Sequence, residues 1–326
     1  MQKLIECVPN FSEGKDQNKI QSIVDRIRSV EGITVLDVDS GQDTNRTVVT
    51  FVGEVPAVLE GAFQGIKEAS RVIDMSSHKG THPRIGSTDV CPLIPLQNVS
   101  MKECVNYSKT LASRVGRELN IPIFLYECSS KSKFRSNLSD IRKGEYEGLK
   151  TKLKDKKWKP DYGPSEFDNP IFNIPRTGVT AIGAREFLIA YNVNLNTFDK
   201  KVATDIALDI RESGRAKRDS KGKIIRDDNG KIIKKRGKFK FCKAVGWYID
   251  EYNQAQVSIN LTNYKKTSIY KVFEEVRRQA RKKGVRVTGS EIVGLVPLQA
   301  MIDSGQYYLN KQNIWKSYPN LKWSKI

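Results

Sequence analysis

The sequence predicts an α/β (α+β) protein built from two tandem units, each with the element order β-α-β-β-α-β. The chain has 326 residues, whereas single hydrophobic cores stop growing at roughly 250–300 residues, so two domains are expected. Hydrophobic residues make up 38% of the chain and charged residues 29%, which is typical of globular domains. Period-two and period-3.6 patterns of apolar residues then follow the same order in both halves.

In the first half, short β-branched runs indicate strands and apolar residues at 3.6-residue spacing indicate helices. The predicted elements in chain order are a strand at 4–8, a helix at 20–30, strands at 33–38 and 47–52, a helix at 56–69 and a strand at 88–96. The polar segment 39–46 predicts a turn across which two strands pair. Pro92 and Pro95 predict an edge position or an irregular path for the last strand.

An additional helix and strand, at 105–119 and 121–126, extend the first half. Residues 131–159 are charged and irregular, and they predict a surface connection with a helical piece at Leu138–Leu149. The segment 161–170 is too rich in glycine and proline for regular structure.

The second half repeats the order of the first. Its predicted elements are a strand at 187–193, a helix at 202–210, strands at 244–248 and 256–261, a helix at 272–280 and a strand that begins at 285–288. Both halves therefore predict split βαβ, ferredoxin-like layers of sheet and helix. The predicted domains are 1–178 and 179–310, followed by a tail at 311–326.

The charge of the chain is strongly positive and unevenly distributed. The formal net charge is +19, and the segment 215–240 has twelve Lys or Arg residues against three Asp, a local charge of +9. Such an excess predicts anionic partners. Asn229-Gly230 lies between two short apolar runs, so the segment predicts an inserted basic hairpin. A solvated projection is favoured over a nucleic-acid arm, because only Phe239 and Phe241 flank it as stacking groups.

Other broad classes are disfavoured. No apolar run reaches the roughly 20 residues of a membrane helix, and the N-terminus lacks the features of a signal peptide. Five scattered cysteines without CxxC spacing indicate neither a disulfide framework nor a zinc site. Walker and dinucleotide-binding motifs are missing. The sequence therefore predicts a soluble protein of the cytoplasm.

Both histidines of the chain lie in the stretch His78–Gly86. Histidine is the side chain that ordinarily titrates near neutral pH, so proton transfer is expected here. The spacing of His78 and His82 suits a helical metal pair, but Gly80 and Pro83 disfavour a helix, and we predict no metal. Loop histidines that hydrogen-bond to backbone groups remain the structural alternative.

Several phrases of this sequence, taken in order, resemble one enzyme family. They are Cys7–Gly14, Asp39–Gly41 with Asn45–Val48, His78–Gly86, Ile141–Leu149, Gly163–Ser165, Gly183–Leu188 and Ser290–Pro297. Together they resemble glutamate formimidoyltransferase, the folate-dependent enzyme of histidine degradation, over about residues 3–310. In animals a cyclodeaminase domain follows the transferase, and we expect this chain to lack it.

The resemblance implies transfer of the formimino group from N-formimino-L-glutamate to N5 of tetrahydrofolate. It also implies a homodimer in which the two subdomains of each chain enclose a folate-binding tunnel. His82 matches the catalytic histidine of the family. The folate-binding segment of the family falls on Gly163, Pro164, Ser165, Glu166, Phe167, Asp168, Asn169, Pro170, Ile171 and Phe172. Only Gly163–Ser165 and Phe167 follow the family pattern closely.

The implied reaction requires a proton to leave N5 and another to reach the departing glutamate nitrogen. A neutral imidazole at His82 can do both in turn. Asp39 either orients that imidazole, holds the cationic amidine, or caps a turn. Arg46, Lys79 and Arg84 are candidates for contacts with the carboxylates of formiminoglutamate or of (poly)glutamylated folate.

Formyl transfer between folate and glutamate, a basic nucleic-acid-binding protein and a non-catalytic folate binder remain alternatives. The role of His78 stays open.

Overall fold

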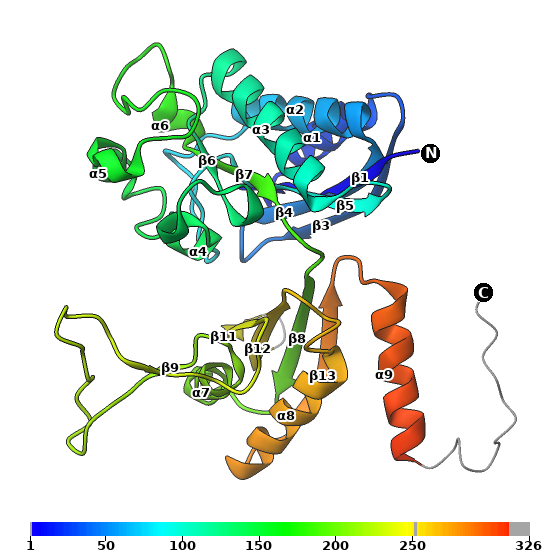
Figure 1. Ribbon diagram of the computed structural model, residues 1–326, viewed down its shortest axis with the longest axis vertical. Coiled ribbons are helices and arrows are strands. Elements are labelled where there is room, and N and C mark those ends of the chain that lie inside the picture. Colours follow the sequence, from blue (N-terminus) through cyan, green and yellow to red (C-terminus); the bar gives the residue numbers. More distant parts are fainter. Residues whose placement is uncertain (1, 251–252, 313–326) are drawn as a thin grey trace, which may run out of the picture. The chain divides into compact units, whose positions relative to one another are not determined.

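The computed structural model describes residues 2–250 and 253–312. The chain divides into two compact units, residues 1–186 and 187–326, which we call unit 1 and unit 2 (Figure 1). Both contain a sheet and helices, so the predicted α+β fold class is confirmed. The division lies after Glu186 rather than after residue 178, because the strand Thr180–Ala184 pairs with strands of unit 1.

Unit 1 contains a seven-stranded sheet and three long helices. The strands are β1 (Leu4–Cys7), β2 (Asn10–Phe11), β3 (Ile33–Gly41), β4 (Arg46–Glu54), β5 (Thr88–Gln97), β6 (Ile123–Leu125) and β7 (Thr180–Ala184). The long helices are α1 (Gln17–Arg28), α2 (Val55–Val72) and α3 (Met101–Glu118). The strand order is β3-β4-β1/β2-β5-β7-β6, antiparallel from β3 to β5 and parallel from β5 to β6.

Local sequence explains where these helices begin and what they cover. The Asp16 carboxylate accepts hydrogen bonds from the first turn of α1, and Ser100 with Glu103 forms a capping box at α3. Apolar stripes of the three helices pack with one face of the sheet around Ile27, Phe51 and Ile66. The opposite face has polar groups such as Asn10 near β2 and β4, and at β5, β6 and β7 it packs in a second buried apolar cluster.

Of the two alternatives predicted for strand β5, the irregular path is confirmed by register shifts in its pairing with β1 and β2, and the edge position is wrong. Strand β5 lies inside the sheet, between β1/β2 and β7, and not at an edge. Pro92 is tolerated there because its carbonyl oxygen still accepts a hydrogen bond from the Val8 N–H at 3.3 Å. Pro95 lies next to a register shift in the β1–β5 pairing and beyond the residues that pair with β7.

The predicted helical piece at Leu138–Leu149 is wrong in its extent. Two short helices, α4 (Leu138–Ile141) and α5 (Leu149–Lys154), flank a turn in which Gly144 and Glu145 have positive φ angles of 82° and 52°. A third short helix, α6, covers Ile174–Thr177. This connection is more than a surface segment, because Ile141, Leu149 and Leu153 belong to a second buried cluster of unit 1.

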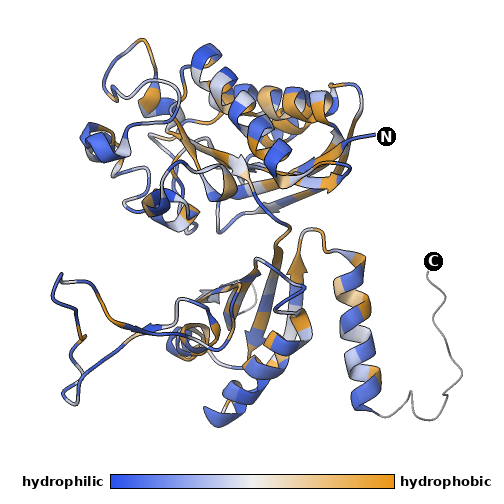
Figure 2. Ribbon diagram, in the orientation of Figure 1, coloured by the Kyte–Doolittle hydropathy of each residue, from blue (hydrophilic) through white to orange (hydrophobic). Residues whose placement is uncertain are grey.

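Unit 2 contains a four-stranded antiparallel sheet in the order β11-β12-β8-β13. Its elements are β8 (Ile189–Leu195), α7 (Lys200–Ile210), β11 (Cys242–Ile249), β12 (Gln254–Leu261), α8 (Ile269–Lys282), β13 (Val287–Val293) and α9 (Leu298–Lys311). Much of α8 is hydrophilic in Figure 2, and its apolar stripe, which includes Val272 and Val276, packs with α7 against the sheet. The predicted tail beyond residue 312 lies outside the described residues.

The basic segment projects from unit 2 as an arm (Figure 1). At its base β9 (Arg215–Ala216) pairs with β10 (Lys234–Lys235). The predicted Asn229-Gly230 turn is present, but a single bridge between Arg226 and Ile232 flanks it in place of two strands. An equivalent turn precedes it, because 218–225 and 226–233 repeat the pattern Arg-Asp-x-x-Gly-Lys-Ile-Ile.

Candidate active site

Both histidines lie on the irregular loop between α2 and β5. This loop rests on the β3–β4 turn, where the Thr81 N–H donates to the Asp43 carbonyl oxygen at 3.2 Å. A side chain at Gly80 would approach the Thr44 carbonyl oxygen to 2.4 Å, so the close approach requires glycine. The loop therefore has a defined path, and its two histidines lie in different surroundings.

His78 is held at both ring nitrogens. Arg84 Nε donates to His78 Nδ1 at 3.3 Å, so Nδ1 carries a lone pair and Nε2 carries the proton. Nε2 then donates to the Asn45 carbonyl oxygen at 3.0 Å. Burial is the largest cause that lowers the pKa of His78. These contacts give His78 a structural role in this loop.

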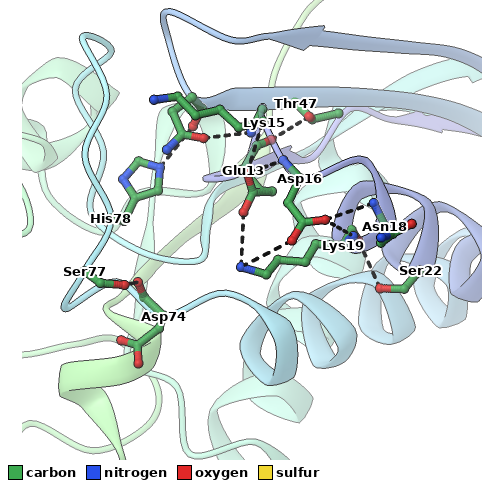
Figure 3. Close-up of polar contacts among 12 residues, drawn as sticks. Glu13, Lys15, Asp16, Asn18, Lys19, Ser22, Thr47, Asp74, Ser77 and His78 are labelled. Carbon is green, nitrogen blue, oxygen red and sulfur yellow. Dashed lines mark hydrogen bonds and ion pairs between the residues drawn. The ribbon is translucent and has the colours of Figure 1, made fainter.

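The residues around His78 form a continuous polar network at the start of α1 (Figure 3). The Thr47 hydroxyl donates to the Glu13 carbonyl oxygen at 2.6 Å, and the Glu13 carboxylate lies 3.5 Å from Lys19 Nζ (Figure 3). Asn45 accepts from the Gly14 N–H and donates to the Lys79 carbonyl oxygen. The network thus ties β4 and the histidine loop to the first turn of α1.

Arg84 is buried, with 8% of its side chain exposed, and it is fully engaged. Nη1 and Nη2 reach the Glu145 and Glu147 carboxylates at 2.9 Å and 2.6 Å, and Nη2 also donates to the His78 carbonyl oxygen. The guanidinium therefore joins the histidine loop to the 142–148 turn. All five donor hydrogens of Arg84 have protein acceptors, so none is left for a substrate carboxylate.

His82 faces cations. The positive charges of Arg46 and Arg142 act on its ring, and with burial as the larger cause they lower the pKa of His82 to about 2. Its Nδ1 is buried and has no hydrogen-bond partner among the described residues. The imidazole is therefore neutral over the working range of an enzyme, and it keeps an unused nitrogen.

Arg46 begins β4 and donates from Nη2 to Asn10 Oδ1. Burial lowers its pKa to about 10, with the nearby Arg142 adding to the effect and the carboxylates of Asp89 and Asp39 opposing it. Its Nε is also buried without a partner among the described residues. Asp39, which pairs with Val48 across the β3–β4 ladder, is thus an electrostatic neighbour of Arg46.

Asp89 and Arg142 complete the cluster. Asp89 is 1% exposed and accepts hydrogen bonds from the Ile85 N–H through Oδ1 and from Arg142 Nε through Oδ2, both at 3.0 Å. This carboxylate therefore connects the histidine loop, the start of β5 and the residue that follows α4. Arg46, His82 and Arg142 come together from three segments far apart in the chain.

Two family models match this chain in tandem. The N-terminal subdomain of the formiminotransferase domain matches residues 4–185, and the formiminotransferase domain matches residues 190–321. This chain belongs to the formiminotransferase family. The resemblance drawn from the sequence motifs is thereby confirmed.

The family includes relatives of two lengths. A glutamate formimidoyltransferase of Streptococcus pyogenes is 44% identical over 313 residues, which cover 96% of this chain and 95% of that protein. One of Thermoplasma acidophilum is 44% identical over 308 residues, covering 94% and 92%. A formimidoyltransferase-cyclodeaminase of Dictyostelium discoideum is 49% identical over 315 residues, covering 97% of this chain and 54% of that protein. This chain spans about half the length of the cyclodeaminase-bearing relatives.

The segment Gly163–Phe172, which the sequence resemblance predicts to bind folate, lies beside the end of α3. Part of it lines a cavity of about 370 Å³. The lining residues are Ser113, Gly116, Arg117, Asn120, Tyr162, Gly163, Pro164, Glu166 and Phe172. Gly163 has a φ of +80°, and a side chain there would come within 2.4 Å of the Ile121 carbonyl oxygen. The geometry therefore requires glycine at the start of this segment.

The rest of the segment is held by local contacts. Ser165 donates to Glu166, Asn169 accepts from the Ile171 N–H, and Asp168 pairs with Lys150 at 2.9 Å. The Phe167 ring lies 6.4 Å from the Tyr146 ring. Because Tyr146 stands between Glu145 and Glu147, the segment adjoins the turn that Arg84 holds.

The sequence motifs did not single out Asp89 or Arg142 as functional residues. Arg142 lies inside the motif Ile141–Leu149, and its place in a family motif was the one sequence feature that pointed to it. Its pairing with Asp89, 53 positions earlier, depends on the tertiary fold. Lys79 is exposed at the edge of the loop. Within residues 2–250 and 253–312, no cluster of three potential metal-binding side chains occurs, and no helix is long and apolar enough to cross a bilayer.

Proposed function

We propose that this chain transfers the formimino group from N-formimino-L-glutamate to N5 of tetrahydrofolate. The observation that carries the proposal is the neutral, partly buried His82, whose Nδ1 has no hydrogen-bond partner in the described part of the chain and whose ring is under the charge of Arg46 and Arg142. The Streptococcus pyogenes relative, whose length this chain nearly matches, is named for that activity. Folate-linked transfer within histidine degradation is therefore the function that this site supports best.

His82 is proposed to move the protons. Bound tetrahydrofolate supplies the nucleophilic N5. A neutral imidazole accepts a proton at its free nitrogen and returns it to the departing glutamate nitrogen, which contributes roughly 10²–10⁴ in rate. Asp39 supports this role through its charge, which acts on Arg46, and it either orients the imidazole or holds the cationic amidine.

Three cations are candidates for contacts with substrate carboxylates. Arg46 is supported best, because its buried Nε has no partner within residues 2–250 and 253–312 and its positive charge acts on His82. Lys79 is exposed on the same loop and suits a more distant carboxylate, such as that of a (poly)glutamyl tail. Arg84 is supported least, since its donors are bound to Glu145, Glu147 and His78.

Folate is proposed to contact the segment Gly163–Phe172. The pocket there is open to solvent, it offers the Phe172 ring and the Tyr162 side chain, and Arg117 supplies a positive charge for an anionic ligand. A homodimer in the cytoplasm completes the proposal. The location is supported by five cysteines that are all unpaired in the structure.

The test is a transfer assay with purified protein, tetrahydrofolate and N-formimino-L-glutamate, with 5-formiminotetrahydrofolate measured by mass spectrometry. N-formyl-L-glutamate is assayed side by side, because formyl transfer is the alternative within the same chemistry. Greater turnover with the formimino donor supports the proposal. A folded protein that transfers neither group, or that transfers formyl alone, contradicts it.

A further inference from the structure

Two arginines from distant parts of unit 1 share one small region. Arg46 enters it from β4 and Arg142 from the residue after α4. Each guanidinium is held by a hydrogen bond, Arg46 to Asn10 Oδ1 and Arg142 to the Asp89 carboxylate. The two anchors are neighbours in the sheet, because Asn10 pairs with Val48 of β4 on one side and on the other with Val90 of β5, the residue after Asp89. Like charges held together by separate anchors are unfavourable unless an anion joins them.

The positive charges of the same two arginines lower the pKa of His82, in addition to its burial. Asp39 and Asp89 oppose the charge of Arg46, and Asp89 is engaged with Arg142 and the Ile85 N–H. Arg46 also keeps a buried Nε donor without a partner among the described residues. The cluster thus combines two guanidiniums with a buried Nε donor that has no partner among the described residues, which are the properties of a carboxylate site.

We propose that Arg142, positioned by Asp89, forms with Arg46 a two-arginine site for a carboxylate of the formimino donor. This inference rests on the proposed function and adds a binding residue to it. A carboxylate placed between the guanidiniums offsets the two charges that disfavour protonation of His82. Donor binding therefore removes the part of the pKa lowering that the two arginines cause, while burial, the larger cause, remains, so the His82 imidazole is a better base with the donor bound than without it.

Asp89 acts as a positioning residue in this arrangement. It is buried and binds the backbone of the histidine loop with one oxygen and Arg142 with the other. Asp89 thereby fixes the distance between the arginine and the His82 loop. The Asp89→Asn variant is expected to raise KM for the formimino donor more than tenfold, with a smaller change in KM for tetrahydrofolate, which a general loss of fold would not produce.

The decisive experiment is an NMR titration of the histidine rings. The chain has two histidines, so the ring spectrum is simple, and His82→Asn assigns it. N-acetyl-L-glutamate serves as a non-reacting dicarboxylate and N-acetyl-L-glutamine as its monocarboxylate control. In the free protein, His82 should not titrate across about pH 5–8, where an ordinary histidine does. With N-acetyl-L-glutamate, its titration should move upward toward that range.

Arg142→Gln should weaken binding of N-acetyl-L-glutamate about 10–100-fold, the loss expected for charge-assisted hydrogen bonds. Lys143→Gln removes the neighbouring cation, which is exposed and paired with Asp140, and it should bind as the wild type does. If Arg142→Gln does not fold, Arg142→Lys keeps the charge and loses the planar fork, and it should give an intermediate affinity.

The inference and the proposed function fail in different ways. Unweakened binding by both Arg142 variants, or a His82 that titrates as an ordinary histidine in the free protein, overturns the two-arginine site even when formimino transfer is measured. Binding that depends on Arg142 supports the site, even if the protein then transfers no formimino group and the proposed reaction is wrong.

Discussion

Units 1 and 2 share one topology and differ in the side chains on the sheet face opposite the long helices. The order β1-α1-β3-β4-α2-β5 in unit 1 corresponds to β8-α7-β11-β12-α8-β13 in unit 2. The strand order also corresponds, since β3-β4-β1-β5 matches β11-β12-β8-β13. Each sheet buries one face under its helices. The connection between the first helix and the next strand is short in unit 1, whereas in unit 2 it contains the basic arm.

The face opposite the helices shows the larger difference. Unit 1 gathers the ionic cluster of Arg46, Arg142 and Asp89 beside a neutral histidine. Unit 2 has amides around one carboxylate: Gln256 accepts from Trp247 Nε1 at 2.7 Å and donates to Asn194 Oδ1 and Glu291 Oε1 at 2.8 and 2.9 Å, and Asn192 also donates to Glu291. Satisfied amides stabilise a sheet but move no proton, while buried charges destabilise the fold and mark functional sites. We therefore expect the proton chemistry in unit 1.

The largest effect is expected at His82. His82→Asn removes the base and keeps a polar side chain of similar size, so turnover should fall roughly 10²–10⁴-fold. Steady-state assay with both substrates measures this loss, and circular dichroism checks the fold. His78→Gln is the matched control, because His78 already uses both ring nitrogens in protein contacts. Near-normal turnover of His82→Asn would show that His82 is not the base and that the catalytic site need not lie in unit 1.

The same histidine should set a pH dependence of stability. The pKa of His82 is about 2 in the folded chain and near 6.5 when unfolded, so the unfolded state binds a proton that the folded state does not. The free energy of unfolding should therefore fall as pH drops below about 6.5, by at most about 1.4 kcal/mol per pH unit from this group. Urea titrations of wild type and His82→Asn measure the slope. Equal slopes would contradict the buried neutral state of His82.

The next effect concerns the support of the histidine loop. Arg84→Met leaves Glu145 and Glu147 without their partner, and we expect a loss of about 2 kcal/mol of unfolding free energy, less than for a fully buried pair because both carboxylates are partly exposed. Arg176→Met, which breaks the exposed pair with Asp74, should change stability by less than about 1 kcal/mol. Equal losses of unfolding free energy in the two variants would show that the Arg84 ion pairs stabilise the fold no more than an exposed pair does.

The sequence predicted the element types well because apolar periodicity records which side of each element is buried. At β5 the prolines predicted an edge or an irregular path; the irregular path is confirmed by the register shifts, and the edge is wrong because a proline carbonyl can still accept a hydrogen bond inside the sheet. The candidate site was predicted through the histidine loop. The different roles of His78 and His82 depend on Arg84 and Arg142, whose partners lie 61 and 53 positions away. No local pattern specifies such pairings.

A smaller effect is expected in unit 2. Gln256→Leu removes the acceptor of Trp247 and a donor to Glu291, and it should lower the free energy of unfolding by about 1–2 kcal/mol. Turnover per folded molecule should stay within about twofold, since the amide network moves no proton. Ser258→Ala, on the same strand, is the control. A tenfold loss of turnover with Gln256→Leu would place substrate contacts on the sheet face of unit 2 opposite its helices as well.

The smallest effect is expected from the basic arm, which distinguishes the two units most plainly. Its two turns stabilise themselves: Asp219 caps one and Asp227 the other, and Arg218 and Arg226 fold back onto the carbonyl oxygens of their own turns. Replacing 217–233 with Asn-Gly joins Ala216 to Lys234 by a two-residue turn and preserves the β9–β10 pair.

This shortened arm should fold with a change of less than about 0.5 kcal/mol and turn over normally, because the replaced residues contact each other rather than the sheet. Binding to single-stranded and duplex DNA is measured before and after the replacement over a series of salt concentrations. Steeply salt-dependent binding by the intact chain that the replacement abolishes would make the arm a nucleic-acid contact. Undetectable binding by the intact chain would indicate that the arm is a solvated projection. The ionic cluster of Arg46, Arg142 and Asp89 in unit 1 would then be the charged group with a proposed function.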